Sequence, residues 1–153
     1  MQPSQKCYDF IQGKEGFKLT AYQDSAEVWT IGIGSILYID GSPVKKNDTI
    51  TKEQAIDLFH WELEKKASKV NAFLIGTVVN QNQFDALVSF AYNVGTEALR
   101  VSTLLKLVKA KPLDKNIKDA FLVWNKAHVN GKLVTVKGLL LRRQSESDLY
   151  FTS

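Results

Sequence analysis

The feature that most constrains the fold is a long segment of helical periodicity in the middle of the chain. Thr51 and Gln54 form a capping box, in which each side chain can bind the other residue's backbone N–H at a helix start. Apolar residues then recur at steps of three and four, which is the spacing of one helix face. They are Ile56, Phe59, Leu63, Ala67 and Val70. We predict a long helix over residues 52–71 that joins two lobes as their spine.

The segment before this helix favours strands. Residues 19–39 are rich in β-branched and aromatic side chains, and turn-forming residues occur at 24–27 and 40–43. The pattern predicts a small antiparallel sheet of two or three strands. Gly32 and Gly34 lie within it, where another backbone or a ligand is expected to come close.

The other segments favour helices. Ser4 can cap a first helix that ends between Gly13 and Gly16, and Asn80 can cap another that ends at Gly95. Shorter helices are expected near 100–109, 114–126 and 138–150.

Together these segments predict an α+β fold built as one domain, residues 1–153. We expect a small antiparallel sheet lobe over about 15–50 and a larger helical lobe formed by 1–14 and about 72–153, with the helix 52–71 between them.

Composition narrows the class of protein. Hydrophobic residues make up 44% of the chain and charged residues 24%, which is typical of globular domains and excludes a disordered chain. The net charge of +4 favours an anionic partner, such as nucleic acid, an anionic membrane surface or a cell-wall polymer. The single cysteine, Cys7, allows no intrachain disulfide, so packing must stabilise the fold. Cys7, His60 and His128 do not have the spacing of metal ligands.

Targeting signals are not evident in the sequence. The first residues lack the apolar core of a signal peptide, and no apolar run reaches the length of a membrane span. We therefore expect a protein made in the cytoplasm, without stable membrane association, that needs an outside route for any work beyond the inner membrane.

Three residues near the start could carry acid/base chemistry. Glu15 follows Ile11 by four residues and is expected on or just past the apolar face of the first helix, while Asp24 lies in a turn and Thr30 in the next strand. Each alone is ordinary, because glutamates at helix ends, aspartates in turns and threonines in strands are common. As a set they fit a glycosidase, which needs one carboxylic acid for the leaving oxygen and one carboxylate for water or for nucleophilic attack.

The spacing of these residues resembles a known family. Asp24 follows Glu15 by nine residues, and Thr30, which begins Thr-Ile-Gly-Ile-Gly, follows it by fifteen. This pattern is similar to that of the phage-type lysozymes (endolysins) of glycoside hydrolase family 24, the family of the T-even phage lysozyme. Downstream segments match the family in the right order: Gln83–Gly95, Ser102–Leu105, Trp124, Gly138-Leu139, and Arg142-Arg143 with Glu146.

The resemblance implies a muramidase that cleaves the β-1,4 bond between N-acetylmuramic acid and N-acetylglucosamine in peptidoglycan. Glu15 would be the general acid, Asp24 would position or activate the water, and Thr30 would share that water. It implies neither a cofactor nor a metal. Family members of this type generally invert at the anomeric carbon, so we expect the wider carboxylate gap that leaves room for water.

The resemblance also implies a cleft between the lobes. Ile36, Tyr92 and Thr103 align with sugar-contacting positions of the family. Tyr92 can equally fill core, and Thr103 can equally cap a helix. Arg142 and Arg143 could bind an anion, but pairing with Glu146 at spacings of four and three is the simpler interpretation.

Two positions depart from the family pattern. Ser35 stands where the family usually has histidine after Thr-Ile-Gly-x-Gly, so a charged pair across the lobe is lost. Glu27 stands where the family commonly has glycine, which suggests a different turn geometry and adds a third carboxylate near the cleft. A solvated turn residue is the simpler interpretation of Glu27.

Two functions from different classes fit these observations. The first is an endolysin acting on peptidoglycan glycan strands as a monomer, in the periplasm after holin-type release from the host cytoplasm. The second is a catalytically weak or inactive binding or scaffolding module on the same fold, which would be expected to have lost one of Glu15, Asp24 and Thr30. Nucleic-acid binding has no basic-aromatic motif behind it.

Overall fold

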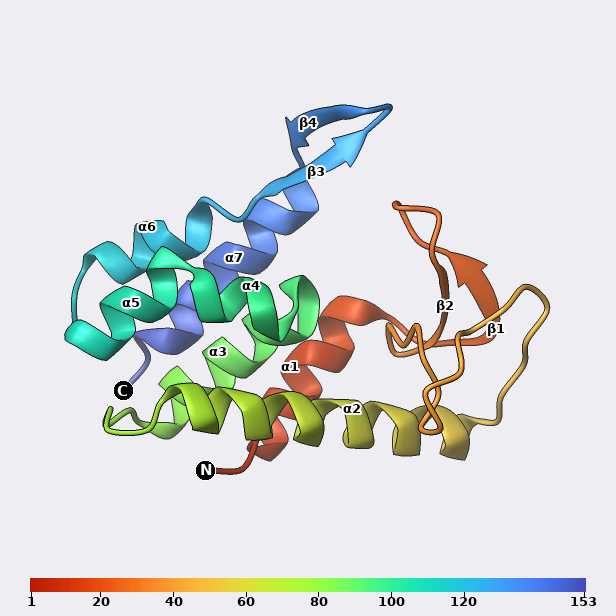
Figure 1. Ribbon diagram of the computed structural model, residues 1–153, viewed down its shortest axis with the longest axis horizontal. Helices are drawn as coiled ribbons and strands as arrows, with labels where there is room; N and C mark the ends of the chain where they lie inside the picture. The colour runs from red at the N-terminus through yellow and green to blue at the C-terminus, as the bar shows by residue number, and fades with distance from the viewer.

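The computed structural model describes residues 1–153 and confirms the α+β class, with a small sheet lobe and a larger helical lobe joined by a long helix (Figure 1). The elements are α1 (Gln5–Glu15), β1 (Lys18–Gln23), β2 (Trp29–Gly32), α2 (Lys52–Phe73), α3 (Gln81–Val94), α4 (Thr96–Val101), α5 (Thr103–Ala110), α6 (Asn116–Leu122), β3 (Lys126–Val129), β4 (Lys132–Thr135) and α7 (Lys137–Tyr150).

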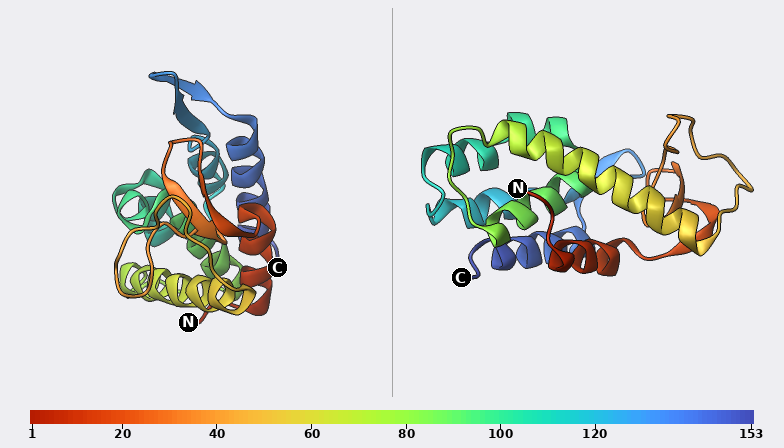
Figure 2. Two further views of the ribbon diagram at one scale, coloured as in Figure 1. Left: turned by 90° about the vertical axis from the view of Figure 1, so that its right-hand side faces the viewer. Right: turned by 90° about the horizontal axis from the view of Figure 1, so that it is seen from below.

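Helix α2 is the spine that the sequence predicts, and it ends two residues beyond the expected position 71. Both capping-box bonds form at its start: Gln54 N donates to Thr51 Oγ1 over 3.1 Å, and Thr51 N donates to Gln54 Oε1 over 2.8 Å. Seen from below, α2 runs from under the sheet lobe to the far side of the helical lobe (Figure 2). Phe59 and Leu63 belong to the main core, whereas Leu58 packs in the sheet lobe, so one helix contributes to both lobes.

The sheet lobe contains one regular two-stranded sheet. Strands β1 and β2 are antiparallel, with Tyr22 opposite Thr30. The strand-favouring residues 36–39 do not form a third strand, because Leu37 makes only an isolated bridge to Pro43. A small apolar cluster of Ile31, Val44 and Leu58 holds this lobe against α2.

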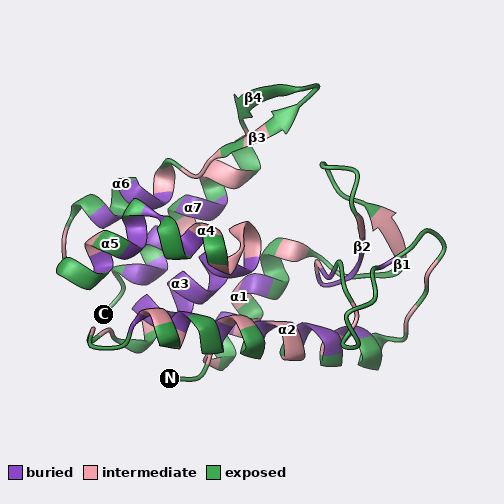
Figure 3. Cartoon of the chain, in the orientation of Figure 1, coloured by how far each residue is buried: buried purple, intermediate pink, exposed green.

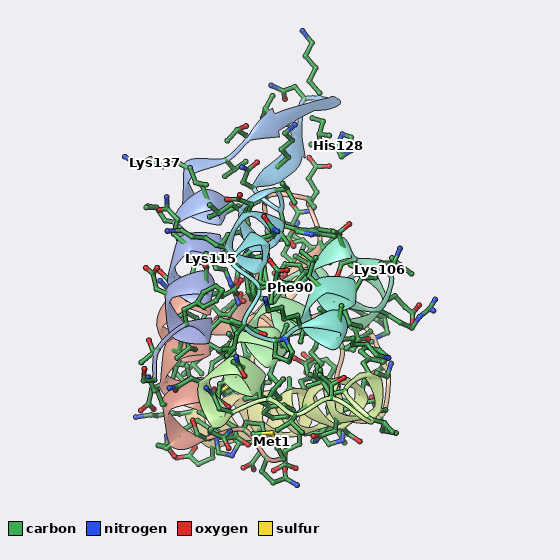
Figure 4. All side chains as sticks on the ribbon, turned by 90° about the vertical axis from the view of Figure 1, so that its left-hand side faces the viewer. Met1, Phe90, Lys106, Lys115, His128 and Lys137 are labelled. Carbon is green, nitrogen blue, oxygen red and sulfur yellow. The ribbon has the colours of Figure 1, made fainter.

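The core of the helical lobe is arranged around α3. All residues from Gln83 to Tyr92 are buried, and the helix is almost wholly in the buried colour of Figure 3. Phe90 lies inside this lobe, with its ring edge-on to Phe121 and Trp124, while Lys106 and Lys115 lie at the surface (Figure 4). Helix α3 is therefore the element against which α1, α2 and α7 pack.

The C-terminal part differs from the prediction at three places. The helix expected near 100–109 is two helices, α4 and α5, because Ser102 leaves the helical conformation and its Oγ caps α5 by accepting from Leu105 N. The helix expected over 114–126 is shorter, and the antiparallel hairpin β3–β4 follows it.

The sequence signal for this hairpin is the pair Asn130-Gly131, which a search for helical periodicity does not detect. Asn130 and Gly131 have φ values of 51° and 75°, as the central residues of a type I′ turn require, and an Asn-Gly pair between strand-favouring residues is the strongest short hairpin signal. The hairpin projects from the helical lobe toward the turn between β1 and β2 (Figure 1). None of the helices is both long and apolar enough to span a membrane.

Glu27, for which the sequence predicts an altered turn geometry, lies in the turn between β1 and β2. Its φ is 62°, which is the left-handed conformation that glycine favours, so the prediction of a different turn geometry is not supported. The Glu27 side chain is exposed and forms no ion pair, as a solvated turn residue would.

We expect Glu27→Gly to be more stable than Glu27→Ala by about 1 kcal/mol, because alanine keeps the Cβ that disfavours the left-handed conformation. Urea unfolding of both variants measures this difference. Both substitutions remove the same charge, so a loss of repulsion in the turn would stabilise both equally. Equal stabilities would show that the backbone conformation of residue 27 costs nothing.

Candidate active site

A cavity of about 370 Å³ lies where the two lobes meet. It brings together Glu15 from the end of α1, Asp24 from the β1–β2 turn and Thr30 from β2. Ile36 and Tyr92 also line it, whereas Thr103 does not. The other lining residues are Tyr22, Gly34, Glu62, Lys66, Asn93, Val94 and Gly95. A hollow of similar size, about 390 Å³, between residues 38–50 of the sheet lobe and the first turns of α2 contains none of the three predicted catalytic residues.

Glu15 is the last residue of α1, and its carboxyl points away from the helix into the cavity wall. Its Oε1 atom accepts a hydrogen bond from Arg142 Nη1 on α7, and 18% of the side chain is exposed. The sequence places apolar residues near this carboxyl, but in the structure it contacts a guanidinium instead. Its other oxygen, Oε2, lies where a Cβ atom on Gly34 would be only 2.9 Å away. The sequence predicts that another backbone or a ligand comes close at Gly34, whereas in the structure the neighbour is the side-chain carboxyl of Glu15.

Arg142 belongs to a buried charge cluster on α7. As predicted, Arg142 and Arg143 both pair with Glu146, at Nε–Oε distances of 3.2 and 2.8 Å. Ser89 Oγ of α3 donates to the same carboxylate over 2.8 Å, and Arg143 Nη2 donates to Asn93 Oδ1 over 2.8 Å. Sequence reasoning missed the contact between Arg142 and Glu15. The sequence signal for this contact is that two arginines, Arg142 and Arg143, share the single partner Glu146, because the two guanidinium groups then have N–H donors left for a further carboxylate.

Asp24 is held by the backbone of its own turn. Its Oδ1 atom accepts hydrogen bonds from Ala26 N over 2.8 Å and Val28 N over 2.9 Å, while Oδ2 has no hydrogen-bond partner. The aspartate therefore does what turn aspartates ordinarily do and still presents a free carboxylate oxygen at the cavity. An exposed carboxylate fixed in this way can accept a hydrogen bond from a water molecule.

Thr30 is 3% exposed and lines the same cavity. Its hydroxyl donates to Val28 O over 2.9 Å, so its proton is already used. What remains available at Oγ1 is a lone pair, which makes Thr30 an acceptor toward a water molecule in the cavity. Val28 thus connects the two residues, because its N–H binds Asp24 and its carbonyl binds Thr30.

A second polar cluster lines the cavity, and sequence reasoning did not single out its centre. Glu62 of α2 accepts a hydrogen bond at Oε2 from Ser35 Oγ over 3.1 Å, and Tyr92 Oη lies 3.1 Å from the same oxygen. Ser35 thus contacts a carboxylate as a neutral donor. Lys66 lies one helical turn beyond Glu62, with Nζ 4.9 Å from the centre of the Tyr92 ring. A glutamate four residues before a lysine on a cavity-facing helix is the signal that could have found this cluster.

The predicted sugar-contacting residues have different surroundings. Ile36 is 45% exposed and forms part of the cavity wall. Tyr92 is buried, and the single proton of its hydroxyl is shared between Ile33 O at 2.7 Å and Glu62 Oε2 at 3.1 Å, so Tyr92 links α3 to the residue that follows β2. Thr103 is exposed at the start of α5, where Ser102, not Thr103, is the capping residue. No three His, Cys, Asp or Glu side chains are placed to share a metal ion.

Comparison with known proteins agrees with this geometry. The profile of the family described as Phage lysozyme matches residues 12–146. The chain belongs to the phage lysozyme family. It is 36% identical to the endolysin of Salmonella phage P22 over 152 residues, with 99% of each chain covered. It is a glycoside hydrolase of the lysozyme type, and its relatives are endolysins.

Solved structures share the whole fold of this phage lysozyme. The endolysin from Escherichia coli O157:H7 phage FAHEc1 is 44% identical, with a TM-score of 0.89 and 99% and 94% of the two chains covered. The muramidase domain of SpmX from Asticaccaulis excentricus is 31% identical, with a TM-score of 0.84 and 99% of each chain covered.

We expect Gly34→Ala to lower kcat/KM for cell-wall hydrolysis by about 10- to 100-fold, because a Cβ atom displaces the Glu15 carboxyl from its position. The positive φ of 79° adds backbone strain to this effect. Gly13→Ala is the matched control, since nothing lies within 4 Å of its added Cβ atom, and it should keep full activity. Initial rates with folded variants measure the effect. Unchanged activity of Gly34→Ala would contradict it.

Glu62 should make stability depend on pH. Burial raises the pKa of Glu62 above its ordinary 4.5, while Lys66 and the donors Ser35 and Tyr92 oppose this rise. A carboxyl whose pKa is higher in the folded state contributes stability at low pH that is lost as the pH rises through that folded pKa.

Glu62→Gln should therefore gain stability relative to the wild type as the pH is raised from below 4.5 toward about 7. Urea unfolding at a series of pH values measures this trend. Glu64→Gln, on an exposed position of the same helix, should show no such trend. A stability difference between Glu62→Gln and wild type that does not change with pH would exclude this assignment.

Proposed function

We propose that this phage lysozyme hydrolyses the β-1,4 bond between N-acetylmuramic acid and N-acetylglucosamine by a single displacement that inverts the anomeric carbon. The observation that carries the proposal is the convergence of Glu15, Asp24 and Thr30 on one cavity between the lobes. These three residues come from a helix end, a turn and a strand, so their convergence is a property of the fold and not of one local motif.

In the proposed reaction Glu15 gives its proton to the glycosidic oxygen, and the bond from that oxygen to the anomeric carbon breaks. Oε2 is the oxygen suited to this step, because Oε1 is bound by Arg142. The positive charge of Arg142 stabilises the carboxylate that remains after the proton has left. The products separate with the new hydroxyl on the N-acetylglucosamine side.

Asp24 and Thr30 hold the attacking water on the other side of the sugar. The water donates one proton toward Asp24 Oδ2 and the other toward Thr30 Oγ1, which leaves an oxygen lone pair for the anomeric carbon. As the new carbon–oxygen bond forms, Asp24 takes up the proton. Single displacement of this kind requires carboxyls far enough apart to admit the water.

The cavity wall suggests which sugar contacts to expect. Ile36 offers an exposed apolar surface to a sugar ring. Tyr92 uses its hydroxyl within the protein and is covered by Lys66 on one ring face, so we assign it to shaping the cavity more than to stacking. Thr103 does not line the cavity, so any sugar contact that it makes would lie outside it.

The alternative function, a catalytically inactive peptidoglycan-binding module, has no observation in its favour. Such a module has no need to keep all three reacting groups, yet each is present at the cavity. We further propose that the enzyme works as a monomer on the cell wall, and that it reaches the periplasm from the host cytoplasm through a holin-type pore.

We expect Glu15→Gln to abolish lysis, with a loss of at least about 100-fold, because the amide cannot protonate the leaving oxygen. The assay is turbidity loss of outer-membrane-permeabilised Gram-negative cells. Glu64→Gln removes the same charge at an exposed position outside the cavity and should lyse at the wild-type rate. Equal rates for wild type and Glu15→Gln would refute the role of Glu15, and no lysis by the wild type at any salt or pH would favour the binding module.

The stereochemical prediction has its own measurement. Proton NMR during the first minutes of hydrolysis of soluble peptidoglycan oligosaccharides should show the α-anomer of the new reducing end before mutarotation, because single displacement inverts the β linkage. Initial formation of the β-anomer would instead indicate a double displacement with Asp24 as the nucleophile.

A further inference from the structure

Tyr22 is a further polar side chain at the catalytic cavity, and it has no role in the reaction proposed above. It belongs to β1, is half-buried, and lines the cavity together with Glu15, Asp24 and Thr30. Its hydroxyl forms no hydrogen bond within the protein, yet it is not buried out of reach of solvent. The hydroxyl is therefore open to the cavity, with its proton and its lone pairs available.

The pairing of β1 with β2 places Tyr22 on the water-binding side of the cavity. Tyr22 and Thr30 are direct partners across the antiparallel ladder, and directly opposite residues point to the same face of a sheet. Asp24 follows Tyr22 by two residues, in the adjoining turn. Lys18 Nζ lies 4.5 Å from the centre of the Tyr22 ring, which restricts the ring. One strand pair and its turn thus carry Tyr22, Asp24 and Thr30.

The charges around Tyr22 favour the protonated hydroxyl. Burial raises the pKa of Tyr22 above its ordinary 10.0, and the negative charges of Glu15 and Asp24 raise it further. The phenol therefore keeps its proton throughout the pH range in which a carboxylic acid and a carboxylate can act together, so Tyr22 is a hydrogen-bond donor in that range.

The attacking water lacks a donor in the reaction as described so far. Asp24 Oδ2 and Thr30 Oγ1 accept its two protons, and one of its two lone pairs attacks the anomeric carbon. An ordered water typically makes about three hydrogen bonds, so the second lone pair is expected to have a partner. Thr30 cannot be that partner, because its proton is bound to Val28 O. Tyr22 has the free hydroxyl among the sheet-lobe side chains that line the cavity.

We propose that the Tyr22 hydroxyl donates a hydrogen bond to the attacking water, so that Tyr22 is a third water-binding residue beside Asp24 and Thr30. The inference rests on the proposed function, because it needs direct displacement by water. Two acceptors alone let the water rotate about the line between its protons, and this rotation turns the attacking lone pair away from the anomeric carbon. The donor prevents the rotation before the reaction begins. Tyr22 keeps its own proton, while one water proton passes to Asp24 and the other stays on the new hydroxyl.

The test variant is Tyr22→Phe, which removes the hydroxyl and keeps the ring beside Lys18. Tyr8→Phe is the matched control, because Tyr8 is also half-buried, its hydroxyl also has no hydrogen-bond partner, and it lies outside the cavity. In Tyr22→Phe, kcat should fall about 10-fold while KM stays within about twofold, since the contact is to the water and not to the sugar. Tyr8→Phe should keep the wild-type kcat. Initial rates on soluble peptidoglycan oligosaccharides measure both constants.

A second substrate distinguishes the water-binding side from the acid side. In an aryl glycoside of the disaccharide of N-acetylglucosamine and N-acetylmuramic acid, the leaving phenolate needs little protonation. Glu15→Gln should therefore recover much of its activity on this substrate. Tyr22→Phe should still lose about 10-fold in kcat, because water attacks the anomeric carbon of both substrates.

Four outcomes would overturn the proposal. An unchanged kcat in Tyr22→Phe means that the hydroxyl does not hold the water, and a loss confined to KM means that it binds the sugar. A loss that disappears on the aryl glycoside means that Tyr22 assists Glu15, and an equal loss in Tyr8→Phe means a general effect on the fold. Failure of the proposed function gives a different result, in which the wild type cleaves neither substrate or Glu15→Gln cleaves the oligosaccharides at the wild-type rate.

Discussion

The catalytic end of the molecule depends on the pairing of Arg142 with Glu15. This contact ties the last residue of α1 to α7, and Arg142 is itself held by Glu146. Burying charges is expensive unless they are paired and hydrogen-bonded, and both Ser89 Oγ and Arg143 Nη2 donate to Glu146 Oε1. The acid therefore has a fixed place because three helices, α1, α3 and α7, meet around one set of buried charges.

A second polar cluster, around Glu62 on another wall of the cavity, joins the sheet lobe to the helical lobe. The Ser35 hydroxyl donates to Glu62, and the Tyr92 hydroxyl shares its one proton between Ile33 O and Glu62, so two hydroxyl groups join α2, α3 and the segment after β2. In the family pattern a histidine stands where this chain has Ser35. Here neutral hydroxyl donors reach the carboxylate, and the positive charge near Glu62 comes from Lys66 on the same helix. The Arg142–Glu15 pair and the cluster around Glu62 together fix where Asp24 and Thr30 lie relative to Glu15.

Patterns that repeat along the chain were the easiest to interpret. The face of α2 and the caps at Thr51 and Asn80 gave two helices within a few residues, because local hydrogen bonds decide where a helix starts. The separate helix α4 and the β3–β4 hairpin were missed, since a six-residue helix and a two-residue turn carry little periodic signal, whereas the segment Ser102–Leu105 at the start of α5 was already among those that resemble the family. The offsets among Glu15, Asp24 and Thr30 indicated the cavity, but they contained no information on Arg142 or Glu62, which reach the site through tertiary packing.

The β3–β4 hairpin has a consequence for how such enzymes can diversify. All residues of β4 are exposed, and the turn at Asn130-Gly131 sets the register without help from a core. Ala127 and Val129 of β3, with His128 between them, nevertheless line a hollow that also contains Glu15 and Arg142. One rim of the reacting centre is thus built from residues that carry little of the folding free energy. Insertions or charge changes in this rim can alter which wall polymers gain access while the fold remains stable, which makes the hairpin a natural place for host adaptation and for engineering.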